Sequence, residues 1–164
     1  ASITQSERVT FIAGGETRQQ SVMRGVAPAP QAEYIAIHDA ARPLFSPAIF
    51  HAVVAAAREH AAALSLIPVR DTIHDMNADG SVARTLDRSM LGAAQTPQCF
   101  RRDLLVRLFE QGEGEPIDAT DEAGLAVRFG YTVRAVPGDP RNLKITVPED
   151  LAIAESYLEQ WGAS

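Results

Sequence analysis

Apolar residues recur at regular spacings along most of the chain, and the spacings predict alternating strands and helices. The clearest helical pattern follows Ser46-Pro47, where Ser caps a helix and Pro suits its first position. Five apolar residues then repeat at three- and four-residue spacings, which places one apolar face against a sheet: Phe50, Val53, Val54, Ala57 and Ala61.

Further elements follow from the same reading of spacing and turn residues. Short apolar, β-rich runs predict strands at residues 9–12, 34–37, 64–67, 132–136 and 143–146. Amphipathic stretches predict helices at residues 18–26, 100–111 and 121–129. Thr146-Val-Pro-Glu149 has the form of a capping box and predicts a last helix through Leu158. Gln95-Thr-Pro-Gln98 is expected at a sheet edge, because Pro97 cannot donate to a ladder.

The order of these elements predicts an α/β fold with a largely parallel twisted sheet flanked by helices. The 164 residues fit a single domain, which we take as residues 1–164. One segment interrupts the alternation: Asn77-Ala-Asp-Gly80 is a turn signal between two extended stretches. We expect a hairpin arm at about residues 69–94. Because such an arm cannot bury both faces alone, it predicts a homodimer.

Composition narrows the classes of function. The net charge of −6 argues against broad nucleic-acid binding, and no apolar run approaches the length of a membrane span. Cys99 is the only cysteine, so an internal disulfide is impossible and a cytoplasmic location is expected. Lys144 is the only lysine among 15 basic residues. The histidines show no metal-ligand spacing.

The loop His38-Asp-Ala-Ala-Arg-Pro43 follows a predicted strand, where open α/β sheets bind ligands. Asp39 could hold a ribose hydroxyl or a divalent ion, and Arg42 could clamp a phosphate with two hydrogen bonds. The alternative is that Asp39 caps the loop and pairs with Arg42. His38 is interpreted as a structural histidine at the strand end.

Three further segments carry candidate anion-binding groups, each with a structural alternative. Arg88, at the end of the arm, reaches a phosphate or forms a surface pair with Asp87. Thr120 donates its hydroxyl to a phosphate at a helix start or belongs to an ordinary helix cap. Lys144 aims a point charge at a phosphate or protects a sheet edge.

Eight segments in this order resemble the 2-C-methyl-D-erythritol 4-phosphate cytidylyltransferases of the non-mevalonate isoprenoid pathway. They are Gly14-Gly-Glu-Thr-Arg-Gln-Gln-Ser-Val22, His38-Asp-Ala-Ala-Arg-Pro43, Pro68-Val-Arg-Asp-Thr72, Thr85-Leu-Asp-Arg88, Gln95-Thr-Pro-Gln98, Thr120-Asp-Glu-Ala123, Asn142-Leu-Lys-Ile-Thr146 and Pro148-Glu-Asp-Leu151.

The resemblance implies a Rossmann-like, glycosyltransferase-A-like fold, an interlocked homodimer and cytidylyl transfer from CTP to a sugar-alcohol phosphate with Mg²⁺. It implies the catalytic residues Asp39, Arg42 and Lys144, with Asp39 also as a metal ligand. It implies the following substrate-binding residues: Arg88 of the partner subunit, Thr96, Thr120 and Asp121. It implies the following CTP-binding residues: Gly15, Glu16, Ser21, Asp39 and Ala40.

The family also has a leading strand, a Gly-rich loop and a Pro-Lys pair that these 164 residues do not contain. We therefore expect the domain to be N-terminally incomplete and inactive alone. One alternative function is cytidylyl transfer to ribitol 5-phosphate, which Thr85-Leu-Asp-Arg88 followed by Leu91 disfavours. The other is a non-catalytic dimerising domain, which the retained Asp39, Arg42, Thr120 and Lys144 disfavour.

Overall fold

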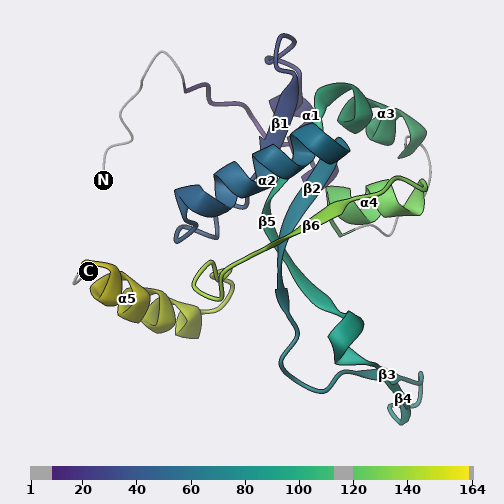
Figure 1. The fold of residues 1–164 in the computed structure, drawn as a ribbon, viewed down its shortest axis with the longest axis vertical. Coiled ribbons are helices and arrows are strands. Elements are labelled where there is room, and N and C mark those ends of the chain that lie inside the picture. Colours follow the sequence, from purple (N-terminus) through teal and green to yellow (C-terminus); the bar gives the residue numbers. More distant parts are fainter. Residues whose placement is uncertain (1–8, 113–119, 163–164) are drawn as a thin grey trace.

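The computed structural model describes residues 9–112 and 120–162, so the two ends of the expected 1–164 domain lie outside it. A four-stranded sheet has the order β1-β5-β2-β6 and forms the centre of the fold (Figure 1). Its strands are β1 (Tyr34–Ile37), β2 (Ala62–Pro68), β5 (Gly92–Arg101) and β6 (Arg134–Pro137). A separate two-stranded hairpin consists of β3 (His74–Met76) and β4 (Val82–Thr85).

Three of the four central strands run in one direction. β2 pairs with β6 in parallel, and both β1 and β2 pair with β5 antiparallel, so β5 alone is reversed. This arrangement confirms an α/β sheet flanked by helices and corrects one expectation. Residues 95–98 do not lie at an edge of the sheet; they belong to β5, which lies between β1 and β2. Pro97 is accommodated because the β2–β5 register shifts between Leu64 and Leu66, opposite this segment.

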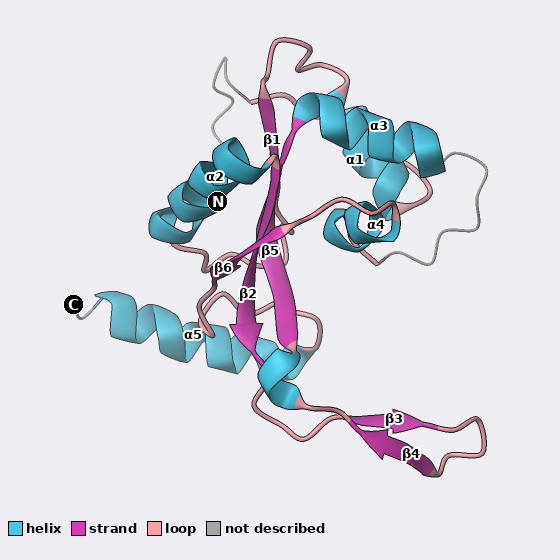
Figure 2. Cartoon of the chain, turned by 45° about the vertical axis from the view of Figure 1, so that its right-hand side comes forward, coloured by secondary structure: helices cyan, strands magenta, loops and turns pink. Residues whose placement is uncertain are grey.

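Helices cover both faces of the sheet. Helix α2 (Pro47–His60) packs Ile49, Val53 and Ala57 against Ala63 and Cys99 on one face. The opposite face is covered by α1 (Arg18–Val26), α3 (Arg102–Gly112) and α4 (Glu122–Arg128), as Figure 2 shows from the side. The core there includes Phe100 of β5. The sheet therefore lies between two layers of helices, which leave the loops at the ends of the strands uncovered.

Local capping explains where several helices begin. The hydroxyl of Ser46 accepts a hydrogen bond from the Ile49 amide at 3.3 Å, and Pro47 occupies the first turn of α2, as predicted. Thr17 caps α1 in the same way through the Gln20 amide at 3.1 Å. Within the described part of the chain, no helix has the length and apolarity needed to cross a membrane.

The last helix, α5 (Pro148–Gly162), begins with a different cap from the expected one. The side chain of Asp150, not Glu149, accepts from the Thr146 and Val147 amides at 2.8 and 3.1 Å. These bonds lower the pKa of the Asp150 carboxyl from its ordinary value. Because α5 starts at Pro148, the third helical residue is Asp150, and its carboxylate reaches back over the first turn.

Two predicted strands are absent from the structure. Residues 9–12 form no strand and are exposed, with Phe11 63% accessible. Residues 143–146 form a loop that contacts the rest of the backbone through the Ile145 amide and the Ala41 carbonyl at 2.8 Å. An apolar run becomes a strand only where a neighbouring edge accepts its hydrogen bonds, and no described strand pairs with either segment.

A hairpin made of β3 and β4 lies within the segment expected to form the arm. β3 and β4 stand away from the central sheet in both views (Figures 1 and 2) and are joined through Asn77 to Gly80. Gly80 has a φ of +85°, which favours glycine in this turn. The arm leaves the sheet after β2 and returns through a 3-10 turn at Arg88–Met90. Residues 92–94, which we assigned to the arm, belong to β5.

Candidate active site

A cavity of about 230 Å³ opens beside the carboxyl ends of β1 and β6. The residues that line it come from five segments far apart in the sequence: Arg18, Asp39, Arg42, Ala94, Gln95, Thr96, Gln98, Thr120, Asp121 and Lys144. Six of the predicted site residues are among them: Asp39, Arg42, Thr96, Thr120, Asp121 and Lys144. The position agrees with the rule that open α/β sheets bind ligands beyond the carboxyl ends of their strands.

The Asp39 carboxylate lies at the centre of three cations. Lys144 Nζ is 3.1 Å from Asp39 Oδ2, and Arg42 Nε is 3.7 Å from the same oxygen. Arg18 Nη2 is 3.9 Å from Asp39 Oδ1. The Asp39 side chain is mostly buried, whereas Lys144 is half exposed at the mouth. One carboxylate therefore gathers three positive groups at one cavity, and their charge exceeds its own. The cavity is suited to an anion with more than one negative charge, such as a phosphate.

Arg42 is fixed by the backbone around it. Its Nη1 donates to the Asn142 carbonyl at 2.7 Å and its Nη2 to the Ala94 carbonyl at 3.4 Å. Burial lowers the pKa of the Arg42 guanidinium, and Asp39 opposes that shift; the group stays protonated. Because two carbonyls set its plane, Arg42 is oriented before any ligand arrives.

A buried amide network supports this frame. Asn142 is fully buried, and its Nδ2 donates to the Thr96 carbonyl at 2.8 Å. Gln95 donates to the carbonyls of Asp139 and Asn142 at 2.9 and 3.2 Å. The loop that carries Lys144 is thus tied to β5 through buried hydrogen bonds. Sequence reasoning missed Gln95 and Asn142 as supports, because polar residues at core positions give no pattern signal.

Asp121 and Thr120 lie on the α4 side of the cavity. Asp121 is the N-cap of α4: its Oδ1 accepts from the Gly124 amide at 2.7 Å, and its Oδ2 accepts from Gln98 Nε2 at 2.7 Å. Both Asp121 oxygens therefore have partners within the protein, one of them in the helix cap. Thr120 is exposed beside it and lines the cavity.

Arg18 and Glu122 form an ion pair that the sequence did not reveal. Arg18 Nη1 lies 2.6 Å from Glu122 Oε1, across 104 positions of sequence. Glu122 is buried, and its Oε2 has no hydrogen-bond partner among the described residues. The negative charge of Glu122 is compensated, because its carboxylate faces the Arg18 guanidinium. Arg18 thereby becomes a third cation of the cavity.

The predicted cytosine-binding segment folds at the start of α1. The Gly15 amide donates to Ser21 Oγ at 2.9 Å, and the Glu16 amide donates to Gln20 Oε1 at 2.8 Å. Gly15, Glu16 and Ser21 are therefore together, but they do not line the cavity that contains Asp39. Arg18 connects the two regions, since it belongs to the same helix start and lines the cavity. Ala40 is exposed on the loop after Asp39.

Arg88 lies outside the cavity of its own chain. Its guanidinium donates to the Arg70 carbonyl at 2.5 Å, on the arm. The structure thus brings six predicted residues together and leaves Arg88 outside the cavity.

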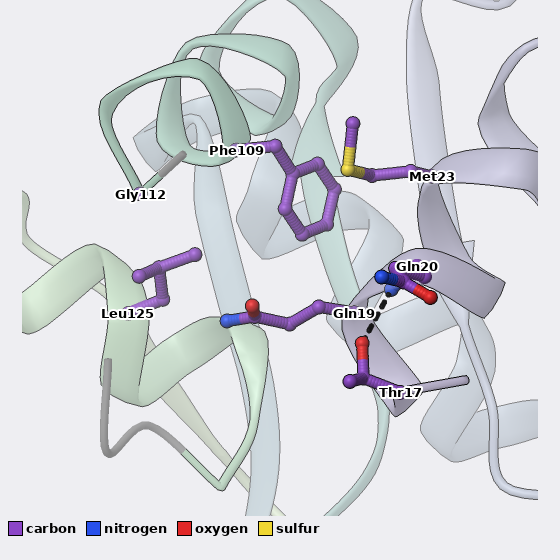
Figure 3. A pocket seen from close by; sticks show the side chains of 7 residues that line it. All are labelled: Thr17, Gln19, Gln20, Met23, Phe109, Gly112 and Leu125. Carbon is purple, nitrogen blue, oxygen red and sulfur yellow. Dashed lines mark hydrogen bonds between the residues drawn. The ribbon is translucent and has the colours of Figure 1, made fainter. Parts of the chain in front are cut away.

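A second cavity, of about 380 Å³, lies between α1, α3 and α4. Figure 3 shows Phe109 and Met23 beside each other, with Gln19 reaching across toward Leu125. Among the residues that line it in the described chain, none carries a charge. This larger cavity is therefore less suited to a phosphorylated ligand than the smaller one around Asp39.

The chemistry of the donors does not fit a resident metal ion. Within residues 9–112 and 120–162, no group of three or more His, Cys, Asp and Glu side chains is placed to hold a metal. Asp39, the predicted metal ligand, is already flanked by Lys144, Arg42 and Arg18. A divalent cation at Asp39 would face these charges directly.

Comparisons with known proteins identify the family of this chain. The family described as "IspD: 2-C-methyl-D-erythritol 4-phosphate cytidylyltransferase" matches residues 1–160. The 2-C-methyl-D-erythritol 4-phosphate cytidylyltransferase of Synechococcus elongatus is 45% identical over 153 residues, which cover 93% of this chain and 66% of that protein. The enzyme of the same name from Pelotomaculum thermopropionicum is 44% identical over 150 residues, or 91% and 63% of the two chains.

Solved structures of similar proteins share the fold. The 4-diphosphocytidyl-2C-methyl-D-erythritol synthase of Anaerococcus prevotii superposes with a TM-score of 0.87 at 29% identity, covering 94% of this chain and 72% of that one. The 2-C-methyl-D-erythritol 4-phosphate cytidylyltransferase of Thermus thermophilus gives 0.83 at 33% identity, covering 96% and 76%. The chain spans about two thirds of the length of the curated relatives described above. This chain belongs to the 2-C-methyl-D-erythritol 4-phosphate cytidylyltransferase family.

Proposed function

We propose that the protein containing this chain transfers a cytidylyl group from CTP to 2-C-methyl-D-erythritol 4-phosphate. The products are CDP-methylerythritol and pyrophosphate. The observation that carries the proposal is the single carboxylate, Asp39, with Lys144 at 3.1 Å and Arg42 at 3.7 Å in one cavity. Membership of the family supports the identity of both substrates.

The reaction is a displacement at phosphorus. An oxygen of the sugar phosphate attacks the α-phosphorus of CTP and forms a new P–O bond. The bond from the α-phosphorus to the bridging oxygen breaks, and its electron pair leaves with pyrophosphate. Two anions must approach each other, so the protein contributes positioning and positive charge rather than a nucleophile. The cations described above supply that charge on the sugar-phosphate side.

Each cation has a distinct task in this proposal. Arg42 presents a planar guanidinium whose orientation is set by two carbonyls, so it fixes the direction of the phosphate. Lys144 stands half exposed at the mouth and exchanges its contact with Asp39 for one with the phosphate. Asp39 keeps both groups in place before the substrate binds. Thr120 and Thr96 add hydroxyl groups on two sides of the cavity.

The nucleotide is proposed to bind at the start of α1 and across the loop after β1. Gly15, Glu16 and Ser21 form the closed turn that would face the cytosine, and Asp39 and Ala40 would face the ribose. The amide of Gly15 is already bonded to Ser21, so this turn is ordered without ligand. Mg²⁺ belongs to the proposal as an ion bound to the triphosphate, because Mg²⁺ in nucleotide complexes is held largely by substrate phosphates and water rather than by a protein cage.

A homodimer is proposed through the hairpin arm. Three large apolar residues on or beside it are exposed, at 59% for Met76, 56% for Val82 and 83% for Met90. Burying them against a second copy is favourable by roughly 1.5–3 kcal/mol for each side chain that becomes fully covered. The same association would bring Arg88 of the partner subunit toward the sugar phosphate.

The test is pyrophosphate release by the full-length protein with CTP, Mg²⁺ and one of two acceptors. We expect turnover with methylerythritol 4-phosphate and at least a hundredfold less with ribitol 5-phosphate. Preferred use of ribitol 5-phosphate would keep the chemistry and change the substrate. Absence of turnover with both acceptors, from a folded protein, would support a non-catalytic domain instead.

A further inference from the structure

His38 directly follows β1, and both nitrogens of its ring form hydrogen bonds. Its Nδ1 lies 3.0 Å from Thr96 Oγ1 on β5, and its Nε2 lies 2.9 Å from the Arg42 carbonyl. The ring also stacks against Phe45 at 4.3 Å between centroids, tilted by 50°. One imidazole thus joins β1, β5 and the far end of the loop that carries Asp39 and Arg42.

The partners determine which nitrogen carries the proton. The Arg42 carbonyl can only accept, so Nε2 must donate to it. In a neutral imidazole Nδ1 then accepts, and the Thr96 hydroxyl donates to it. The Asp39 amide donates to the same Thr96 oxygen at 3.0 Å. The hydrogen bonds therefore run in one direction, from the Asp39 amide through Thr96 to His38, and from His38 to Arg42.

This chain of bonds ends on both loop residues of the candidate site. Asp39 is fixed through its amide, and Arg42 is fixed through its carbonyl. The Arg42 amide also donates to the Asp39 carbonyl at 2.9 Å, which closes the turn between them. A shift of this turn would move the Asp39 carboxylate and the Arg42 guanidinium together.

We propose that His38 is a positioning residue for the sugar-phosphate site, acting on Arg42 through Nε2 and on Asp39 through Thr96. The proposal rests on the proposed function for its kinetic readout. In this role the imidazole does not contact the substrate. Displacement of an oriented group by about 1 Å costs up to about a hundredfold in rate. Loss of the bond to Arg42 should therefore have the larger kinetic effect, because the Arg42 guanidinium is the group that binds the phosphate, and loss of the bond to Thr96 the smaller one.

Two amide substitutions separate the two bonds. In His38→Gln the side-chain NH₂ reaches the position of Nε2 and keeps the bond to Arg42. In His38→Asn the amide oxygen takes the position of Nδ1 and accepts from Thr96, but the Arg42 carbonyl loses its donor. His51→Gln and His51→Asn are the matched controls, because His51 is an exposed residue of α2 outside the cavity.

The experiment measures the KM for methylerythritol 4-phosphate, the KM for CTP and thermal stability in the full-length protein. We expect His38→Asn to raise the sugar-phosphate KM at least tenfold, His38→Gln to raise it by less than threefold, and the CTP KM to change little in either. The His51 variants should match the wild type. Equal effects of His38→Gln and His38→Asn on the sugar-phosphate KM would overturn the proposal.

A double-substitution cycle tests the route through Thr96. His38→Gln and Thr96→Val both remove the hydrogen bond between the hydroxyl and the ring. The double variant should therefore lose no more than about twofold beyond Thr96→Val in kcat/KM. Multiplicative losses would show that His38 does not act on Asp39 through Thr96.

Binding of inorganic phosphate, followed by calorimetry, separates this proposal from the proposed function. If neither acceptor is turned over, the proposed function fails. The positioning role still stands if His38→Asn weakens phosphate binding at least fivefold more than His51→Asn does. It fails if phosphate binds equally to both variants.

Discussion

The ion pair between Arg18 and Glu122 allows the sharpest stability prediction. Glu122 is 1% exposed, and Arg18 Nη1 at 2.6 Å is the partner of its Oε1. Replacing Arg18 by Met keeps much of the side-chain volume and leaves the carboxylate buried without its cation. Breaking a buried pair in this way costs about 3–5 kcal/mol. Because the Arg18 side chain is 36% exposed, water can enter its place, so we expect about 2–3 kcal/mol.

Glu122→Gln is the matched change on the other partner. The amide keeps the shape and still accepts from Arg18, so only the charge assistance is lost, at about 1 kcal/mol. In the double variant no buried charge remains. The double variant should therefore be more stable than Arg18→Met alone by about 1 kcal/mol or more. If the two single losses of stability simply added, the double variant would instead be the least stable of the three.

Urea unfolding of the full-length protein provides the assay. With a slope of about 2 kcal/mol/M, a loss of 2–3 kcal/mol lowers the midpoint by roughly 1–1.5 M. Arg107→Met is the control, because Arg107 pairs with Asp103 on the exposed side of α3, and such surface pairs are worth about 0–1 kcal/mol. Arg18→Met and Glu122→Gln effects that simply add, or an Arg18→Met loss below about 1 kcal/mol, would refute the reasoning.

Three further predictions concern other parts of the chain. Burial raises the pKa of the Cys99 thiol to about 11, so a disulfide reagent at pH 8 should label Cys99 in urea but not in the native protein; rapid native labelling, located by peptide mapping, would contradict this. The folded pKa of Asp150 lies below its unfolded value of about 3.9, so its cap is fully present above that value and is lost as the pH falls through the folded pKa. Hydrogen exchange at the Thr146 and Val147 amides should accelerate in Asp150→Ala at neutral pH, and unchanged exchange would count against the cap. Gly80→Ala should destabilise the hairpin tip by about 1 kcal/mol, seen as faster exchange of the Asn77 amide that donates to the Ser81 carbonyl, and equal protection in both proteins would argue otherwise.

Local signals predicted the elements that depend on local chemistry. The Ser46-Pro47 start of α2, the extent of α1 and the turn from Asn77 to Gly80 each follow from residues within a few positions of one another. These features are fixed by capping, by apolar spacing or by backbone conformation. They can therefore be predicted without knowledge of the tertiary fold.

The sheet required information that local pattern does not contain. The long strand β5 carries Gln95, Pro97 and Gln98, which read as a polar edge segment, yet residues 95–100 are buried between β1 and β2. The amides are buried because they bond to backbone groups distant in sequence, such as the Asp139 carbonyl. Conversely, the apolar residues 9–12 predicted a strand, but no described strand offers them an edge.

The candidate site also contains residues that the sequence predicted and residues that only the structure reveals. Asp39, Arg42 and Lys144 were identified because their motifs stand in the order typical of the family, and the structure places them in one cavity. Arg18 and His38 were not assigned to the site. Arg18 reaches it through a partner 104 positions away, and His38 acts through Thr96, which is 58 positions away. Such pairs leave no mark on short-range spacing.

The central claim is that the Asp39 cavity binds the sugar phosphate, and Lys144→Met tests it most directly. The full-length variant is compared with the wild type and Arg107→Met in pyrophosphate release, with each substrate varied in turn. We predict that Lys144→Met raises the KM for methylerythritol 4-phosphate at least tenfold, as expected for the loss of about 1.4 kcal/mol or more, while the KM for CTP changes by less than threefold. A rise confined to the KM for CTP, or an unchanged KM for the sugar phosphate, would contradict the account.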